Sequence, residues 1–267
     1  MKISISTSIF GREENDTYFI SYLQKLKRAG YEYIEISRKH DNLKQRLTEI
    51  REIGLKVWAV HGTMKSEAIS LDADIRKYAL ETEFVRMQDA AAFAPCPYVI
   101  HYLDRFINTE YGKQFSDVVE QLRVKCAELG FVLAIETAPY SKYDERYADS
   151  LEIAGFVRSF HSPYVQVTVD INNSSLKEDL KQVCENCCGI IGNVHISDNR
   201  GGREQHLVPG CGHLNIRRAV EMLIAADYEG PCNLECHHIN PTTEVLKMIK
   251  ETTEEICKGI NNGSDSM

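Results

Sequence analysis

The chain has 267 residues, of which 43% are hydrophobic and 26% are charged. This composition is that of a globular protein and excludes disordered and collagen-like chains. The 39 acidic and 31 basic residues give a net charge of −8. That charge repels a nucleic-acid backbone, and the sequence has no basic stripe to overcome the repulsion, so we expect no nucleic-acid partner.

The sequence gives no sign of export or of a membrane segment. The N-terminal residues alternate apolar and polar from Ile3 to Thr7 and lack an apolar signal core. A run of about 18 uncharged apolar residues, as a membrane span needs, does not occur. The nine cysteines are an odd number, which fits reduced thiols better than a disulfide framework. We therefore expect a cytoplasmic protein without membrane contact.

Short apolar runs recur about every 30 residues, and each is followed by a stretch with helical periodicity. The predicted strands are residues 3–6, 33–37, 57–61, 98–102, 132–137, 165–170, 191–197 and 232–236. The predicted helices are residues 16–29, 43–53, 72–92, 112–129, 150–160, 177–188, 216–226 and 243–258. Eight strands alternating with eight helices, at about the 250 residues typical of that fold, predict an α/β protein with a single (β/α)8 TIM barrel.

The domain organisation is expected to be simple. No linker or change of composition divides the chain internally, so residues 1–258 are predicted to form one barrel domain. Gly30, Gly54 and Gly130 follow predicted helices, where a left-handed C-cap residue is expected. Residues 259–267 are rich in Asn, Gly, Ser and Asp, and they predict a disordered C-terminal tail.

Polar residues that commonly bind metals stand at the ends of the predicted strands, although strands of a parallel barrel are otherwise buried and apolar. The residues at these strand ends are His61, His101, Glu136, Asp170, His195 and Glu235. The carboxyl ends of all strands meet at one mouth of such a barrel. We therefore expect these side chains to converge there.

Three of these residues are carboxylates, and together they predict a metal ion. Glu136, Asp170 and Glu235 would hold like charges in a poorly solvated site, at a cost on the order of several kcal/mol each unless a cation lies between them. His195 adds a nitrogen donor to the three oxygen donors. This set suits Mn²⁺, Mg²⁺, Co²⁺, Zn²⁺ or Fe²⁺. We predict one divalent metal ion, with Mn²⁺ preferred; the alternative is a structural polar network in the barrel mouth.

The sequence resembles the sugar phosphate isomerase/epimerase family of xylose-isomerase-like TIM barrels. That family includes tagatose 3-epimerase, hydroxypyruvate isomerase, inosose dehydratase and DNA repair enzymes of the endonuclease-four type. The resemblance spans residues 2 to about 256 and is strongest in residues 134–136, 169–170, 194–199 and 204–212. It implies that Glu136, Asp170, His195 and Glu235 bind the metal, and that Glu136 and Glu235 transfer protons.

The activity that this resemblance implies is isomerisation or epimerisation of a small sugar or sugar derivative, by proton transfer next to a carbonyl through a cis-enediolate. Return of the proton by the same glutamate gives isomerisation, and return by the opposite glutamate gives epimerisation. The sequence does not choose between them. The alternatives are a metal-dependent lyase or dehydratase of a keto-sugar or keto-cyclitol, which begins with the same proton abstraction, and a barrel that binds sugar without catalysis.

A repair nuclease is the least favoured member of the family for this chain. The repair enzymes use three zinc ions and carry a ligand histidine three residues after the sixth-strand aspartate, where this chain has Asn173. The net charge of −8 also disfavours DNA. We place Asn173 instead with the substrate-binding candidates, together with His61, His101 and His206, which correspond to positions that contact substrate hydroxyls in the single-metal sugar enzymes.

Three further residues have two interpretations each. Trp58 either supports a sugar ring from below or packs within the barrel. Arg200 either clamps a carboxylate or phosphate group or lies on a solvated loop. Glu35, at the end of the second predicted strand, either bonds a substrate hydroxyl or pairs with Arg38. The expected partner is a small sugar, whose identity and phosphorylation state the sequence leaves open, and barrels of this group often form homodimers.

Overall fold

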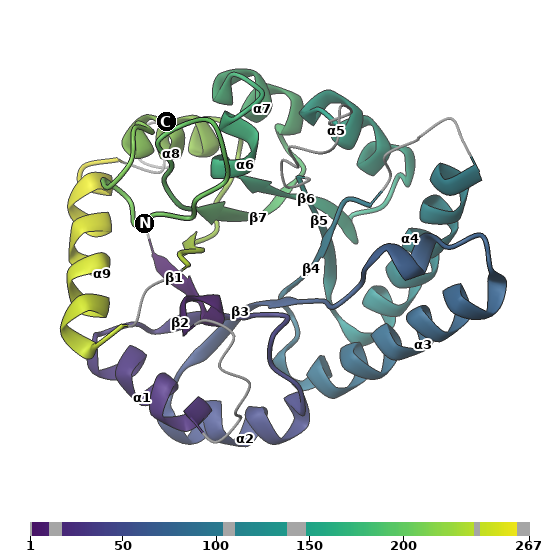
Figure 1. The fold of residues 1–267 in the computed structure, drawn as a ribbon, viewed down its shortest axis with the longest axis horizontal. Coiled ribbons are helices and arrows are strands. Elements are labelled where there is room, and N and C mark those ends of the chain that lie inside the picture. Colours follow the sequence, from purple (N-terminus) through teal and green to yellow (C-terminus); the bar gives the residue numbers. More distant parts are fainter. Residues whose placement is uncertain (1, 11–17, 104–109, 138–147, 238–240, 261–267) are drawn as a thin grey trace, which may run out of the picture.

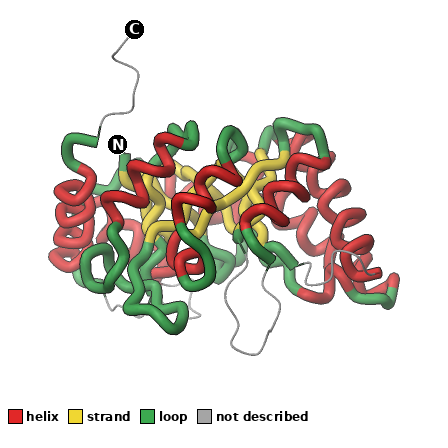
Figure 2. Tube along the Cα trace, turned by 90° about the horizontal axis from the view of Figure 1, so that it is seen from above, coloured by secondary structure: helices red, strands yellow, loops and turns green. Residues whose placement is uncertain are grey.

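The computed structural model describes residues 2–10, 18–103, 110–137, 148–237 and 241–260. The strands form a closed parallel barrel in the order β1 to β8, and helices surround it (Figure 1). Seen edge-on, the strands lie in the middle of the molecule with helices around them (Figure 2). This arrangement confirms the predicted (β/α)8 TIM barrel. Within the described residues, no helix has the length and apolar character needed to cross a membrane.

The strands are short, and each lies within two residues of its predicted range. They are β1 (Ile3–Ser6), β2 (Tyr33–Ile36), β3 (Lys56–His61), β4 (Pro97–His101), β5 (Val132–Glu136), β6 (Val165–Asp170), β7 (Ile191–Ile196) and β8 (Cys232–Leu234). Pairing of β1 with β8, in which Ile5 lies opposite Leu234, closes the barrel. Because every pair is parallel, all carboxyl ends meet at one mouth.

The helices between the strands have one apolar side that packs on the barrel. They are α1 (Phe19–Arg28), α2 (Leu43–Ile53), α3 (Ala73–Ala90), α4 (Glu110–Leu129), α5 (Ser150–Ser159), α6 (Ile171–Ser175), α7 (Leu180–Cys187), α8 (Ile216–Ala225) and α9 (Thr243–Cys257). Periodic burial shows the pattern clearly in α1, where Phe19, Leu23 and Leu26 are buried and the residues beside them in the chain are half-buried or exposed. The main hydrophobic core therefore lies between the strands and the helices.

The short helix α6 was not among the predicted elements. It begins immediately after Asp170, whose carboxylate accepts a hydrogen bond from the backbone N–H of Asn173 at 3.0 Å and so caps the helix. Helical periodicity cannot be recognised in so short a segment. The turn has a consequence for the site, because it fixes the orientation of the Asp170 side chain.

Trp58 lies inside the barrel, away from the mouth. Its side chain packs against Ala59, Val99 and Ala134, and its indole N–H donates to Asn193 at 2.8 Å. A methyl group added to Gly230 would meet the indole at 2.7 Å, and Gly230 precedes the amino end of β8. Of the two interpretations of Trp58, its surroundings match packing within the barrel.

Candidate active site

Four potential metal ligands meet at the carboxyl mouth of the barrel. Glu136 and Asp170 are the last residues of β5 and β6, His195 lies near the end of β7, and Glu235 directly follows β8. Parallel pairing places Asp170 opposite His195. One donor atom from each of the four residues lies within 4.8 Å of the donor atoms of the other three. The structure thus brings together all four residues predicted as metal ligands.

His195 contacts two of the carboxylates through one ring nitrogen. Its Nδ1 lies 2.7 Å from Glu136 Oε1 and 3.3 Å from Glu235 Oε2. On the other side of the ring, Nε2 lies 2.9 Å from Glu35 Oε2. An Nε2–H that donates to Glu35 leaves the lone pair of Nδ1 directed at the carboxylate cluster, which is the tautomer that a metal ligand requires.

Glu35 therefore orients His195, a role that neither of its two sequence interpretations included. The carboxylate of Glu35 is fully buried, and its Oε2 also accepts hydrogen bonds from Asn233 at 2.9 Å and Asn193 at 3.4 Å. No ion pair between Glu35 and Arg38 is found among the described residues. Glu35 is not in the described lining of the cavity, and it contacts the site through the imidazole ring of His195.

Two further histidines bracket Glu136 on its other oxygen. Nε2 of His61 and Nε2 of His101 each lie 3.2 Å from Glu136 Oε2. The two rings meet edge to face with centroids 5.0 Å apart, and the carbonyl of Gly62, 2.9 Å from Nδ1, orients the ring of His61. Three imidazoles thus surround one carboxylate, an arrangement that keeps Glu136 ionised.

Asp170 and His206 are also held by neighbouring groups. The side-chain amide of Asn173 donates to Asp170 Oδ2 at 3.1 Å, while the amide oxygen of Asn173 has no hydrogen-bond partner among the described residues. His206 places Nδ1 3.1 Å from the backbone carbonyl of Glu235, and its Nε2 contacts Glu204. The ring of His237 stacks on that of His206 with centroids 4.0 Å apart. These contacts give the residues around the candidate metal ligands defined orientations.

The charges of the cluster shift its pKa values strongly. Burial raises the pKa of Asp170 to about 7, and the charges of Glu136 and Glu235 add to the increase. Burial opposes protonation of His195, but the negative charges of Glu35, Glu136 and Glu235 raise its pKa well above the usual range. The cluster therefore attracts positive charge, which protons or a metal ion can provide. Its three carboxylates and one imidazole fit a divalent cation with a preference for oxygen donors.

The cluster opens into a cavity of about 200 Å³, defined by the described residues. This volume is below that of sites for drug-sized ligands and suits a small polar molecule. The cavity is lined by Ser8, Ser37, Arg38, Lys39, His61, His101, Glu136, Asn173, Glu204, His206, Glu235 and His237. Four of the six predicted substrate-binding residues, His61, His101, His206 and Asn173, are in this lining.

Trp58 and Arg200 are not in the described lining of the cavity. Arg200 is exposed, and its guanidinium donates to the carbonyl of Cys211 at 3.3 Å. This contact matches the second interpretation of Arg200, a residue of a solvated loop. Sequence reasoning gave no role to Ser8 or Lys39 and considered Arg38 only as an ion-pair partner of Glu35, but all three residues line the cavity. Their position just after β1 and β2 was the available signal, since every loop at this mouth can reach the site.

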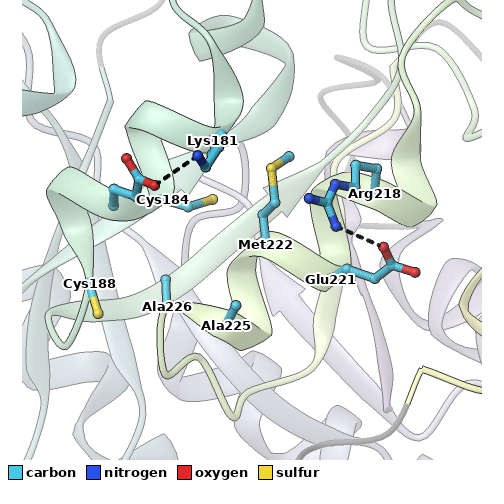
Figure 3. Close-up of a pocket in the computed structure, with 9 residues that line it drawn as sticks. Lys181, Cys184, Cys188, Arg218, Glu221, Met222, Ala225 and Ala226 are labelled. Atoms are coloured by element: carbon cyan, nitrogen blue, oxygen red, sulfur yellow. Dashed lines mark hydrogen bonds and ion pairs between the residues drawn. The ribbon is translucent and has the colours of Figure 1, made fainter.

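A larger hollow of about 420 Å³ lies on the outside of the barrel between α7 and α8 (Figure 3). Its two glutamates are paired with basic neighbours, Lys181 with Glu185 and Arg218 with Glu221, each at 3.4 Å. The rest of its described lining is mainly small or apolar, including Met222. Because the described lining of this hollow lacks the converging imidazoles and carboxylates of the barrel mouth, the mouth is the candidate active site.

Comparisons with known proteins agree with this architecture. Residues 23–254 match the family model described as xylose isomerase-like TIM barrel. No curated protein sequence matches the chain. Similar solved structures include a D-tagatose 3-epimerase-like protein, with a TM-score of 0.80, 18% identity and 98% of each chain covered. Another is the 3-keto-D-glucoside 4-epimerase of E. coli, with a TM-score of 0.77, 20% identity and coverage of 96% and 99%.

A third similar structure is an L-ribulose 3-epimerase, with a TM-score of 0.78, 15% identity and coverage of 97% of this chain and 96% of that chain. At identities this low, the structural similarity establishes a shared fold. The family model, by contrast, covers most of the sequence, including all four clustered metal-ligand candidates. The chain belongs to the family of xylose isomerase-like TIM barrels.

Proposed function

We propose that this protein is a divalent-metal-dependent isomerase or epimerase of a small sugar or sugar derivative. The observation that carries the proposal is the cluster of Glu136, Asp170, His195 and Glu235 at the barrel mouth, next to a small polar cavity. Sugar epimerases among the similar structures support the substrate class. The four residues would hold the ion, with Mn²⁺ preferred.

A bound divalent ion would supply Lewis acidity, which stabilises negative charge on the oxygens of an enediolate. Glu136 and Glu235 are the residues that we assign to proton transfer. They lie on β5 and after β8, which are not neighbours in the barrel, and both line the cavity. One takes the proton from the carbon beside the carbonyl. Return of a proton to the neighbouring carbon, or to the opposite face of the same carbon, completes isomerisation or epimerisation.

The surroundings of the two glutamates determine the protonation state of each. Burial raises the pKa of Glu136, but His195 and His101 outweigh it and hold that pKa well below the usual range. Glu235 is also kept ionised, and its side chain is 12% exposed against 3% for Glu136. Both are therefore bases in the resting protein. Substrate entry must displace water and contacts from one of them to raise its basicity.

A lyase that acts on a keto-sugar is the second candidate, and His206 favours it. Burial opposes protonation of His206, but Glu204, Glu235 and Asp170 raise its pKa to about 9, so the ring is protonated at neutral pH. A protonated imidazole beside the cavity could donate its proton to a departing hydroxyl group. Analysis of products by NMR separates the candidates, because an epimer retains all its oxygens and a dehydration product has lost one as water.

The test of the proposed function is solvent-deuterium exchange into ketoses by the metal-loaded protein. We expect exchange by the wild type and a loss of about 100-fold or more for Glu136→Gln and for Glu235→Gln, because each removes a base. Glu229→Gln, at an exposed position, is the matched control and retains exchange. Metal analysis accompanies the assay and should give one ion per chain. Full exchange by both active-site variants would refute the assignment of the bases.

A further inference from the structure

The loop after β2 adds two cations to the cavity lining that the proposed function does not use. Ser8 follows β1, and Ser37, Arg38 and Lys39 follow β2, whereas the metal-ligand candidates belong to β5, β6, β7 and the end of β8. All four residues after β1 and β2 line the same cavity as Glu136 and Glu235. A ligand that fills the cavity can thus contact both the carboxylates of the cluster and these cations.

The segment after β2 is held in place by hydrogen bonds. The backbone N–H of Ser37 donates to Thr7 Oγ1 at 2.9 Å, which joins this segment to the one after β1. Arg86 on α3 is buried, and its guanidinium donates to the carbonyls of His40 at 2.7 Å and Ser37 at 3.3 Å. It also donates to the carbonyl of His61 at 3.0 Å. The backbone that presents Arg38 and Lys39 is therefore built into the fold.

The side chains of this segment offer donors to a ligand. Lys39 Nζ lies 3.3 Å from the carbonyl of Ser8, which draws its ammonium group to the cavity wall. The hydroxyl of Ser8 is buried and has no hydrogen-bond partner among the described residues. Arg38 is exposed at the rim, and no carboxylate of the described residues forms an ion pair with it. A buried hydroxyl without a partner is costly, so a ligand that bonds it gains affinity.

We propose that Ser8, Arg38 and Lys39 form a binding site for the anionic group of the substrate, a carboxylate or a phosphate. The inference rests on the proposed function, and it narrows the substrate to a ketose that carries a negative charge away from its reacting carbons. Guanidinium and ammonium groups are the side chains that recognise such anions. In a protein of net charge −8, a local pair of cations is also what allows an anion to approach an acidic site.

The test compares charged and neutral ketoses on the Mn²⁺-loaded protein. The probes are D-fructose 6-phosphate and D-fructuronate, each against D-fructose, with deuterium exchange and calorimetric binding as separate measurements. We expect kcat/KM for at least one anionic probe to exceed that for D-fructose about 10-fold or more, through KM. Arg38→Met and Lys39→Met should each reduce this ratio about 10- to 100-fold. Lys65→Met, which removes an exposed charge outside the cavity lining, should keep it.

The two measurements separate failure of this inference from failure of the proposed function. Tight binding of an anionic probe that is lost in Arg38→Met, without deuterium exchange by any probe, supports the anion site and refutes the proton transfer. Exchange that is equally fast with D-fructose, or that responds alike to Arg38→Met and Lys65→Met, refutes the anion site and leaves the proposed function standing. A preference for D-fructuronate over D-fructose 6-phosphate identifies the anion as a carboxylate, and the reverse identifies a phosphate.

Discussion

Among single residues, Glu35 has the most instructive environment, because it acts on the site only through His195. Its Oε2 lies 2.9 Å from Nε2 of His195 and is also bonded by Asn233, so the imidazole has a fixed direction and tautomer. A ligand imidazole that is held from behind by a carboxylate is also a better electron donor. Glu35 is thus a positioning residue for the candidate metal centre.

Replacement of Glu35 tests this role. We expect Glu35→Gln to weaken Mn²⁺ binding by about 10- to 100-fold, because the amide lacks the charge that strengthens the ligand. Titration calorimetry measures the affinity, and circular dichroism checks that the variant is folded. Glu32→Gln, an exposed change just before β2, is the control and should bind Mn²⁺ like the wild type. An unchanged affinity in Glu35→Gln would show that Glu35 has no influence on the metal.

Among the elements, the segment between β7 and α8 depends on one buried carboxylate. Asp198 accepts hydrogen bonds from the backbone N–H groups of Gly210 at 3.0 Å, Gly212 at 2.9 Å and Leu214 at 3.0 Å. Gly212 comes so close that an added Cβ would lie 2.2 Å from the carboxylate. Asp198 thereby keeps this segment folded back on itself. The same segment carries His206, which lines the cavity.

We expect Asp198→Ala to lower the free energy of unfolding by about 3 kcal/mol or more, because several buried N–H groups lose a charged acceptor. Urea denaturation measures this loss. Hydrogen exchange should show faster exchange in the segment between β7 and α8, and deuterium transfer to substrate should decrease as His206 loses its position. The exposed Asp74→Ala is the control, with a change below about 0.5 kcal/mol. An equally small effect in both variants would contradict this role of Asp198.

At the scale of the whole molecule, closure of the barrel forces three carboxylates into one buried cluster. Only the folded chain has this cluster, so a cation that binds there stabilises the fold by mass action. Protons compete with the cation, since the pKa values of Asp170 and His195 are raised and both groups are protonated below them. Metal ligands must be deprotonated, and we therefore expect metal affinity to increase as the pH rises through about 7.

The melting temperature tests this coupling. We expect saturating Mn²⁺ to raise Tm by about 5 °C or more over EDTA-treated protein at about pH 8, and to raise it less at about pH 6. Scanning calorimetry of both forms at both pH values gives the comparison. Glu235→Ala, which removes one ligand, should show little increase at either pH. An increase that is equal at the two pH values, or larger at the lower one, would contradict the competition between protons and metal.

The fold and the four clustered ligand candidates were predictable from the sequence, because both follow from patterns of neighbouring residues along the chain. A buried parallel strand is an apolar run, and a parallel barrel brings the residues after all such runs to one mouth. The positions of Glu136, Asp170, His195 and Glu235 at the strand ends therefore sufficed to predict that they meet. Their convergence follows from topology alone, without knowledge of any side-chain direction.

Only the tertiary structure decided which way the other side chains point. Trp58 and His61 share strand β3, yet the indole packs inside the barrel against Ala59 while the imidazole contacts Glu136. Glu35 contacts His195, which is far away in the sequence, and Arg38 lines the cavity. These outcomes depend on the register between neighbouring strands and on the loops that cross the mouth. Such contacts join residues distant in the chain, so no local pattern of residues specifies them.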